Sequence, residues 1–208
     1  MDNFKIVSHP LIKEKLRFLR DKNTPNIQFR ELLSEISYLM TFEITRDLKL
    51  KDEEIETPMQ KMTAQRIDEH ITIVPILRAG LGMLNGILNL LPTSKVGLIG
   101  LYRDDETLEA KEYYCKLPKH VDEHLVLLLD PMLASGHSLD YAINMLKKRN
   151  VKNIKVVAVV SSPEGVKLLS EKHQDVQFYS AALDKGLNND GYILPGLGDC
   201  GDRLLGTE

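Results

Sequence analysis

An acidic residue and a group of small and hydroxyl residues directly follow an apolar run in the middle of the chain. The run is Val126–Leu129, the acid is Asp130, and the small and hydroxyl residues occupy 134–138. A helical pattern over 139–149 begins immediately afterwards. Backbone N–H groups in such a turn, with the positive end of the helix dipole, form an anion site. A carboxylate beside that site accepts hydrogen bonds from sugar hydroxyls. The pattern therefore predicts a ribose phosphate ligand.

Spacing alone leaves a second interpretation open, because any open α/β sheet contains strand-loop-helix turns with Gly and Ser. The loop is not a Walker A phosphate loop, which needs Gly-Lys-Ser/Thr at its end. It has one glycine, Gly136, where a dinucleotide-binding fingerprint has several. A strand-end aspartate such as Asp130 can also simply cap the following turn.

Two arginines also come directly after apolar segments. Arg78 follows Ile71–Leu77, and Arg103 follows Val96–Tyr102. Guanidinium groups match phosphate oxygens well, although a strand-end arginine can equally form a surface ion pair. Ligands of open α/β sheets bind at the carboxyl ends of the strands. We therefore expect Arg78, Arg103 and Asp130 to converge on one site.

The elements that must position these residues alternate along the chain. This alternation predicts an α/β fold with a mostly parallel central sheet flanked by helices. The predicted helices are Pro10–Leu19, Phe29–Leu48 with Asn26 as its cap, Gly80–Leu91, Leu139–Arg149 and Pro163–His173. The predicted strands are Ile71–Leu77, Val96–Tyr102, Val126–Leu129, Val156–Val160 and Val176–Ala181.

The length of 208 residues predicts a single domain over 1–208. We divide it into N-terminal helices at about 10–48, a core at about 70–181, and a C-terminal segment at about 182–208. That last segment is rich in Gly, Asn and Asp, and read alone it would be a loose surface tail. The apolar stretch 192–195 predicts instead that it folds back onto the body.

Composition excludes several classes of protein. A net charge of −3 argues against a protein dominated by nucleic-acid binding, which needs a basic surface. Every apolar run is shorter than the roughly 20 residues of a membrane span, so we expect no membrane contact. Cys115 and Cys200 form no paired motif, and charged residues interrupt the N-terminus, so we expect a reduced cytoplasmic protein without a signal peptide.

Three segments resemble those of type I phosphoribosyltransferases. The segment 130–138 is similar to their loop for 5-phospho-α-D-ribose 1-diphosphate (PRPP), and its Asp-Pro-Met-Leu-Ala version resembles the uracil phosphoribosyltransferases. The segments 76–82 (Ile-Leu-Arg-Ala-Gly-Leu-Gly) and 196–203 (Gly-Leu-Gly-Asp-Cys-Gly-Asp-Arg) also match, in the same order along nearly the whole chain. The resemblance implies a type I phosphoribosyltransferase-like fold with a C-terminal hood and a flexible flap.

The resemblance also implies an activity and a set of site residues. Uracil and PRPP would give UMP and diphosphate, a reaction of pyrimidine salvage. Asp130, Arg103 and Asp199 would be catalytic, and uracil would contact Ile193, Gly198, Asp199 and Cys200. The PRPP-binding residues implied are Arg78, Arg103, Asp130, Pro131, Met132, Leu133, Ala134, Ser135, Gly136, His137, Ser138 and Asp199.

Two residues depart from the family pattern. His137 stands where the family normally has Gly, so either the backbone there accepts a side chain or the loop is altered. The imidazole could add a phosphate contact or could simply be a tolerated surface substitution. Cys200 stands where the family usually has Ala, which leaves recognition by backbone groups intact.

Other expectations concern partners and moving parts. The charged segment 103–112 is either a solvated hairpin or a flap that closes over PRPP and excludes water. We expect Mg²⁺ to arrive with the diphosphate and no other metal. His120 and His124 could pair on a metal only if their segment were helical, and Pro118 favours a loop. Family analogy favours a homo-oligomer, a dimer or larger, and GTP activates some relatives.

Two competing functions have different sequence requirements. A regulator on this fold that binds RNA would need a basic face and would lack the tail at 196–203. An enzyme for purine bases is disfavoured by the Asp-Pro-Met-Leu-Ala loop and by the same tail. Net charge and tail together favour the uracil enzyme.

Overall fold

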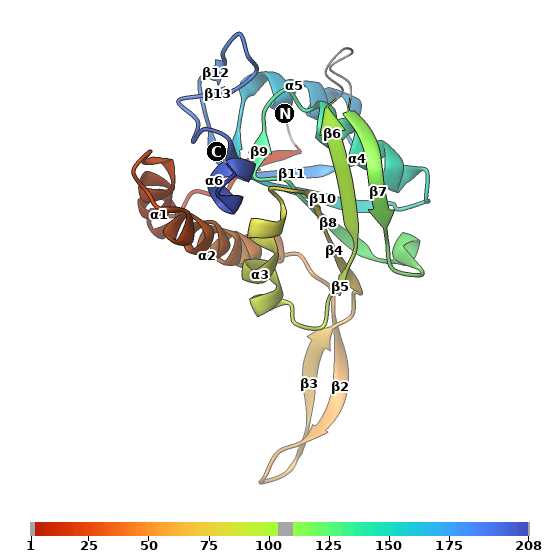
Figure 1. Ribbon diagram of the computed structural model, residues 1–208. Helices are drawn as coiled ribbons and strands as arrows, with labels where there is room; N and C mark the ends of the chain where they lie inside the picture. Colours follow the sequence, from red (N-terminus) through yellow and green to blue (C-terminus); the bar gives the residue numbers. More distant parts are fainter. Residues whose placement is uncertain (1–2, 104–109, 208) are drawn as a thin grey trace.

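The computed structural model describes residues 3–103 and 110–207 and is organised around a central sheet (Figure 1). Its strand order is β1-β11-β10-β8-β4-β6-β7, with β5 paired to β4 and β9 paired to β10. The β6–β7 pair is antiparallel, and the other pairs in this sheet are parallel. The strands are β1 (Phe4–Ile6), β4 (Ile71–Leu77), β5 (Lys95–Val96), β6 (Leu98–Arg103), β7 (Ala110–Lys116), β8 (Leu125–Leu129), β9 (Met132–Leu133), β10 (Asn153–Ser161) and β11 (Gln177–Leu183).

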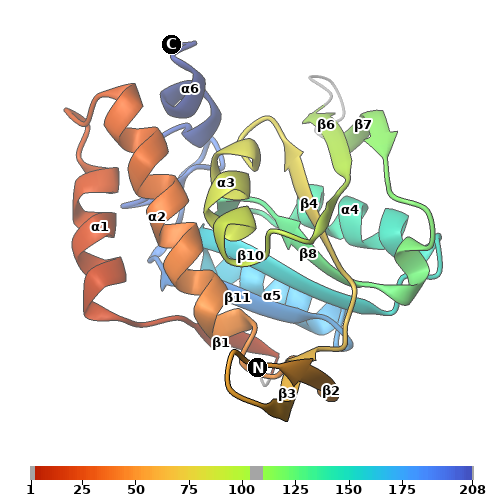
Figure 2. The same cartoon turned by 90° about the horizontal axis from the view of Figure 1, so that it is seen from below.

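Helices cover both faces of this sheet. Figure 2 shows α1, α2 and α3 on one side and α4 and α5 on the other. The helices are α1 (Pro10–Arg20), α2 (Asn26–Ile44), α3 (Leu81–Leu90), α4 (His137–Lys147), α5 (Pro163–Lys172) and α6 (Cys200–Leu205), with a 3₁₀ turn, η1, at Val121–Glu123. The predicted α/β class with a mostly parallel sheet is confirmed.

The strand β8 shows how the sequence produces these layers. Successive side chains of a strand point to opposite faces. Leu127 and Leu129 accordingly join the apolar core beneath α1, α2 and α3. Val126 and Leu128 join the core beneath α4 and α5. All four are fully buried, which explains why this segment is a continuous apolar run.

Two predicted elements differ most from the structure in their boundaries. Asn26 is not a cap: α2 begins at Asn26 itself, and Pro25 occupies the N-cap position with an extended backbone and without a side-chain cap bond. The helix ends at Ile44, four residues before the predicted end at Leu48. The predicted strand Val96–Tyr102 is divided into β5 and β6, with Gly97 between them. A Cβ at Gly97 would lie 2.7 Å from the Leu117 side chain, so the break accommodates a close packing contact.

A hairpin that the sequence analysis did not predict projects from the body. Its strands are β2 (Leu50–Glu56) and β3 (Lys61–Ile67), and they pair in register from Leu50 with Ile67 to Glu56 with Lys61. Figure 1 shows it extending away from the sheet at the end opposite to α6. Every residue of β2 is exposed, and so is nearly all of β3.

The C-terminal segment folds back onto the body, as predicted. It contains the short pair β12 (Gly186–Leu187) and β13 (Ile193–Leu194), followed by α6. The side chains of Leu197, Cys200 and Leu204 are buried in the core beneath α1, α2 and α3. The glycine-rich composition of this segment therefore reflects tight turns, not a loose tail.

Candidate active site

The loops after β4 and β8 lie against each other at the carboxyl ends of these two strands. A Cβ at Gly80 would come within 2.6 Å of the Ile76 carbonyl oxygen and 2.7 Å of the Leu129 carbonyl oxygen. Real Cβ atoms do not approach backbone oxygens so closely, so only glycine fits at this position. This close approach brings the segment that follows Arg78 beside the segment that begins at Asp130.

Asp130 combines a structural contact with an unusual environment. Its Oδ1 accepts a hydrogen bond from the Met132 backbone N–H at 3.2 Å, which caps the turn. Burial raises the pKa of this carboxyl from 3.8 to about 6, although the Met132 bond acts in the opposite direction. A carboxylate can accept several hydrogen bonds. The turn bond therefore leaves acceptor capacity for the hydroxyl groups of a sugar.

The loop that leads into α4 has the geometry of an anion site. Gly136 is the N-cap of α4 and has a φ of +86°, in the left-handed region that favours glycine. The first amides of an α-helix have no partner within the helix, so those of α4 can bind an anion together with the helix dipole. The predicted phosphate loop, 134–138, therefore spans a helix N-terminus.

His137 is compatible with this loop. It is the first residue of α4, so its backbone is helical, and the left-handed conformation falls on Gly136 instead. Its side chain is exposed, and Nδ1 lies 3.2 Å from the Ser135 hydroxyl. The loop consequently accepts a histidine at position 137, because the positive φ that would favour glycine is not at this position.

Residues 131–134 anchor the start of the loop to the sheet. Pro131 and Leu133 are buried, and β9 pairs with β10 through Met132 and Leu133. The Ser162 hydroxyl, at the start of α5, donates a hydrogen bond to the Ala134 carbonyl at 2.6 Å. Pro131 and Leu133 therefore belong to the interior, and the first exposed residues of the loop are His137 and Ser138.

Arg78 connects the β4 loop to the C-terminal segment. Its side chain is half-exposed and forms an ion pair with Asp202, with 3.2 Å between Nη2 and Oδ1. The same guanidinium lies 3.4 Å from the Thr207 hydroxyl. A Cβ at Gly201 would lie 3.6 Å from Arg78 Nη2. The tail motif and the β4 loop, which are distant in sequence, thus meet at one place.

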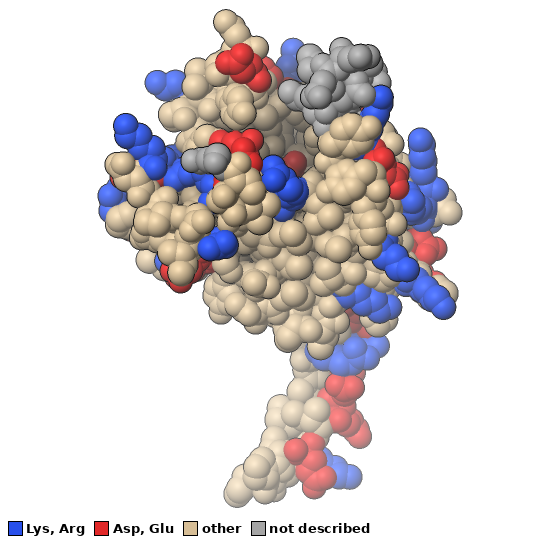
Figure 3. Space-filling model, in the orientation of Figure 1, with Lys and Arg blue, Asp and Glu red and all other residues tan. Residues whose placement is uncertain are grey.

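The tail also reaches Asp130. Cys200, the first residue of α6, is buried. The pKa of its thiol is raised mainly by burial and to a smaller extent by the negative charge of Asp130. Asp199 is the N-cap of α6, and its carboxylate accepts the Asp202 N–H at 2.9 Å. The structure therefore brings Arg78, Asp130, Asp199 and Cys200 to the same edge of the sheet. Figure 3 shows this face, where acidic and basic side chains meet beside a hollow between the C-terminal segment and β6.

The two remaining predicted uracil contacts lie on the approach to α6. Ile193 is buried and pairs with Leu187 in the β12–β13 ladder. Gly198 is exposed and has a φ of +80°. Between them, a Cβ at Gly196 would lie 2.1 Å from the Ile193 carbonyl oxygen. The segment 193–198 is consequently a compact turn immediately before α6.

Part of the predicted site lies outside the residues that the structure describes. The backbone of Arg103 ends β6, but its side chain and residues 104–109 lie outside the described part of the chain. The predicted flap over 103–112 therefore stays a prediction.

Each of the two histidines considered as a metal pair lies near a partner of its own, His124 near Thr72 and His120 near Glu123. His120 and His124 flank the η1 turn, and the His124 ring lies against the Thr72 hydroxyl, with 2.7 Å between Nδ1 and Oγ1. Across residues 3–103 and 110–207, no group of three or more His, Cys, Asp and Glu side chains could hold a metal ion.

The helices of the described residues were also compared with the requirements of a membrane span. None of them combines the necessary length with the necessary apolar character.

Sequence reasoning missed the residues that hold the tail in place. Arg203 donates to the carbonyls of Leu197 at 2.7 Å and Leu19 at 2.9 Å, and its guanidinium lies over the Phe29 ring at 4.5 Å. Arg20 and Asp184 contact the same segment from other elements. Arg203 could have been singled out as the last residue of the tail motif. Arg20 and Asp184 carry no recognisable signal in the sequence.

The chain matches the family model described as "Uracil phosphoribosyltransferase" over residues 6–207. Two similar curated proteins are the uracil phosphoribosyltransferases of Finegoldia magna, 56% identical over 209 residues, and of Levilactobacillus brevis, 54% identical over 209 residues. Each alignment covers 100% of both chains.

Solved structures show the same likeness. The AQ2163 protein from Aquifex aeolicus superposes with a TM-score of 0.91 at 40% identity, over 97% of each chain. A hypoxanthine-guanine phosphoribosyltransferase from Bacillus anthracis superposes with a TM-score of 0.54 at 15% identity, over 76% of this chain and 80% of that one. The second likeness concerns the fold alone, and it agrees with the predicted type I phosphoribosyltransferase architecture.

Proposed function

The chain belongs to the uracil phosphoribosyltransferase family, and we propose that it transfers the ribose phosphate of PRPP to uracil, forming UMP and diphosphate. The observation that carries the proposal is the meeting of three separate segments at one edge of the sheet. Arg78 follows β4, Asp130 follows β8, and Cys200 begins α6. Together they would supply a cation for the diphosphate, an acid for the sugar hydroxyls and a tail for the base, which are groups that this reaction uses.

The chemistry needs positioning and charge stabilisation more than a covalent nucleophile. A bond forms between N1 of uracil and C1 of the ribose, the bond from C1 to the diphosphate oxygen breaks, and the N1 proton is released. Positive charge develops on the sugar and negative charge on the leaving diphosphate. Fixed cations and anions placed against these charges lower the barrier.

We assign the residues by this charge distribution. The backbone of 134–138 and the hydroxyls of Ser135 and Ser138 bind the 5′-phosphate at the N-terminus of α4. Asp130 binds the ribose hydroxyls, and Arg78 with Arg103 holds the diphosphate. Asp199 completes the PRPP site, and the backbone of 193–200 binds the base. Ala134, Gly136 and His137 shape the loop above the buried Pro131–Leu133 stretch.

We propose that Mg²⁺ is bound together with PRPP. The carboxylates of Asp130 and Asp199 are oxygen donors of the type that Mg²⁺ prefers, and the ion keeps several waters and takes phosphate oxygens as further ligands. Bound there, it would neutralise charge on the diphosphate. The residues present thus fit an ion that enters with its substrate.

We propose that residues 1–208 act as one functional domain with a C-terminal hood and a flap at 103–112. The helices of 10–48, the core and the tail contribute side chains to one apolar cluster, which supports this grouping. Cys115 and Cys200 are both free thiols, which supports the proposed cytoplasmic location.

A homo-oligomer, a dimer or larger, is proposed from the β2–β3 hairpin. An isolated two-stranded hairpin is marginally stable in water, and this one exposes Leu50, Ile55, Met59, Met62 and Ile67. Met59 at the tip is 91% exposed. A second copy of the chain would cover these side chains. A molecular mass of one protomer, measured by light scattering at micromolar concentration, would contradict the proposal.

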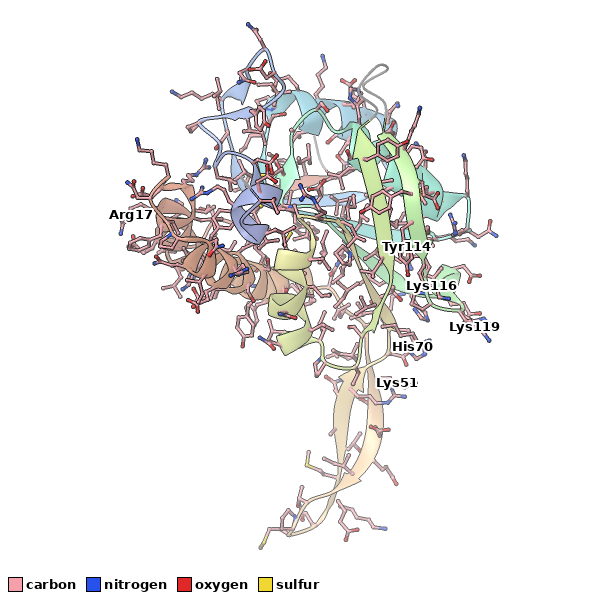
Figure 4. The ribbon with its side chains drawn as sticks, viewed as in Figure 1. Arg17, Lys51, His70, Tyr114, Lys116 and Lys119 are labelled. Carbon is pink, nitrogen blue, oxygen red and sulfur yellow. The ribbon has the colours of Figure 1, made fainter. Side chains whose placement is uncertain are left out.

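GTP activation is proposed for a cavity at the base of this hairpin. The cavity has a volume of about 330 Å³, and its charged lining consists of three cations, Lys51, Arg66 and Lys95, and two acids, Asp68 and Glu69. Asp68 forms an ion pair with Lys51, and two histidines complete the polar lining. The rings of His70 and His124 lie 5.5 Å apart. Figure 4 shows Lys51 and His70 where the hairpin joins the body. Cations suit a triphosphate, and rings suit a purine.

Lys95→Ala tests this assignment. We expect a reduced response of the activity to GTP, with the activity in the absence of GTP unchanged. An unchanged GTP response would contradict the assignment of the effector to this cavity.

The proposed reaction is tested by incubating the purified protein with uracil, PRPP and Mg²⁺ and separating the products by chromatography. We expect UMP and diphosphate in equal amounts. The Asp130→Asn variant should form UMP much more slowly. If the wild-type protein forms no UMP, the proposal is wrong.

A further inference from the structure

Arg20 and Asp184 form a two-armed ion pair beside the base-binding tail. Arg20 Nη1 donates to Asp184 Oδ2 at 2.8 Å, and Nη2 donates to Oδ1 at 2.7 Å. Such parallel bonds between a guanidinium and a carboxylate fix the orientation of both groups. The Asp184 side chain is only 6% exposed and that of Arg20 is 23% exposed, so solvent screens the pair weakly. The arginine ends α1, and the aspartate follows β11.

Both members of the pair also hold the same residue of the tail. Arg20 Nη1 donates to the Gly196 carbonyl at 2.7 Å. The Gly196 N–H donates to Asp184 Oδ2 at 2.8 Å. The two backbone polar groups of Gly196 are thus bound by an ion pair whose partners come from distant parts of the chain. Gly196 has a φ of +60°, so the pair stabilises a conformation that few other residues adopt.

Gly196 lies between the residues to which the proposed function assigns the base. Ile193 precedes it and Gly198 follows it. The next carbonyl, that of Leu197, is bound by Arg203 at 2.7 Å. The backbone is therefore held at consecutive positions immediately before the exposed Gly198.

We propose that the Arg20–Asp184 pair is a positioning element that sets the specificity of the base pocket. Neither side chain belongs to the set that contacts uracil in the proposed function, on which this inference rests. Backbone groups discriminate uracil from cytosine only if they cannot shift to accommodate the exchanged donor and acceptor. The pair supplies that rigidity from outside the pocket.

Kinetic constants for the two substrates test this role. In Arg20→Ala and Asp184→Ala, we expect the KM for uracil to rise roughly tenfold, because each change leaves the backbone of Gly196 without one of its two partners and lets the base-binding segment shift. The KM for PRPP should change less than about threefold, and the preference for uracil over cytosine should fall. The Asp184→Asn variant keeps an acceptor for the Gly196 N–H, so its defect should be smaller than that of Asp184→Ala.

Arg17→Ala is the matched control. Arg17 lies on the same helix and also forms an ion pair, with Glu14 at 2.9 Å, but both side chains are largely exposed. Figure 4 shows Arg17 at the outer side of α1, away from the tail. We expect this variant to have wild-type constants for both substrates.

Binding measurements separate this inference from the proposed function and do not need turnover. By calorimetry, UMP should bind Asp184→Ala roughly tenfold more weakly than wild type, while ribose 5-phosphate binding changes less than about threefold. Equal losses for the two ligands, or wild-type UMP binding in a folded variant, would overturn the positioning role. A wild-type protein that binds UMP but does not form it would contradict the proposed function and leave the positioning role standing on the binding data.

Discussion

The Arg78 guanidinium forms an ion pair with the Asp202 carboxylate, with 3.2 Å between Nη2 and Oδ1. The pair joins the loop after β4 to the last helix of the chain. Because both side chains are substantially exposed, it contributes little to stability, typically less than about 1 kcal/mol. We expect its significance to be functional, since in the proposed function Arg78 holds the diphosphate, and the pair fixes this cation beside the tail.

Replacing Arg78 by Ala should therefore affect catalysis far more than folding. A charge-assisted hydrogen bond contributes about 1.5–3 kcal/mol, which corresponds to roughly one to two decades in kcat/KM for PRPP. Thermal melting should show little change in stability. Asp202→Asn is the comparison variant, and we expect a smaller effect because it leaves the cation in place. A kcat/KM for PRPP within twofold of wild type in Arg78→Ala would rule out the assigned role.

The second prediction concerns Asp130 and pH. Burial raises the pKa of this carboxyl from 3.8 to about 6 in the folded protein. The fold therefore favours the protonated form, and this stabilisation is complete below about pH 4 and is lost as the pH rises through about 6. At pH 8, Asp130→Asn should be more stable than wild type, by on the order of 1–3 kcal/mol, and this gain should be absent at pH 3.5.

The same substitution should reduce activity by roughly one to two decades, because an amide cannot replace a carboxylate in charge-assisted bonds to the ribose. Urea unfolding at the two pH values and kcat/KM for PRPP measure both effects. A variant that is less stable than wild type at pH 8, or fully active, would show that Asp130 serves mainly to cap its turn.

The third prediction contrasts two neighbouring positions of the phosphate loop. Gly136→Ala should weaken PRPP binding and lower stability by about 1–2 kcal/mol, because φ is +86° and a Cβ would lie 3.2 Å from the Leu168 side chain. His137→Gly should leave PRPP affinity unchanged, since the backbone there is already helical. A large loss of affinity in His137→Gly would show instead that the imidazole binds phosphate.

The parts of the fold that the sequence predicts well are those with a continuous apolar core pattern. The strand β4 has the predicted bounds, and β8 and β10 differ from theirs by only a few residues. The β2–β3 hairpin was missed because both of its faces are exposed, so its residues show no apolar alternation. The helix α6 was missed because its six residues are too few to show a helical period.

The candidate site also has parts that the sequence predicts and parts that it does not. Arg78 and Asp130 were predicted to converge because the carboxyl ends of parallel strands share one edge, and the tail was placed by resemblance. The partners of these residues were not predictable, because ion pairs such as Arg78–Asp202 and Arg20–Asp184 depend on the return path of the tail. The conformation at His137 also required the structure, since the sequence does not show which residue of the loop takes the positive φ.

The fourth prediction concerns truncation of the tail. Deleting the chain from Tyr192 onward would remove Leu197, Cys200 and Leu204, which are buried in the core beneath α2. Loss of a buried leucine side chain alone costs about 2–5 kcal/mol. We therefore expect the truncated protein to be strongly destabilised, and not simply unable to bind uracil. A truncated protein with wild-type melting temperature would show that the tail packs on the body only weakly.

Discrimination between bases tests the central claim most directly. With PRPP and Mg²⁺ fixed, diphosphate release is measured for uracil, cytosine and hypoxanthine. Cytosine exchanges an acceptor for a donor and removes the N3 proton, and each buried mismatch costs about 1–3 kcal/mol, so kcat/KM should favour uracil by roughly 100-fold or more. 5-Fluorouracil, which keeps the same hydrogen-bonding groups, should be accepted. Comparable kcat/KM values for uracil and cytosine, or a preference for hypoxanthine, would contradict the account.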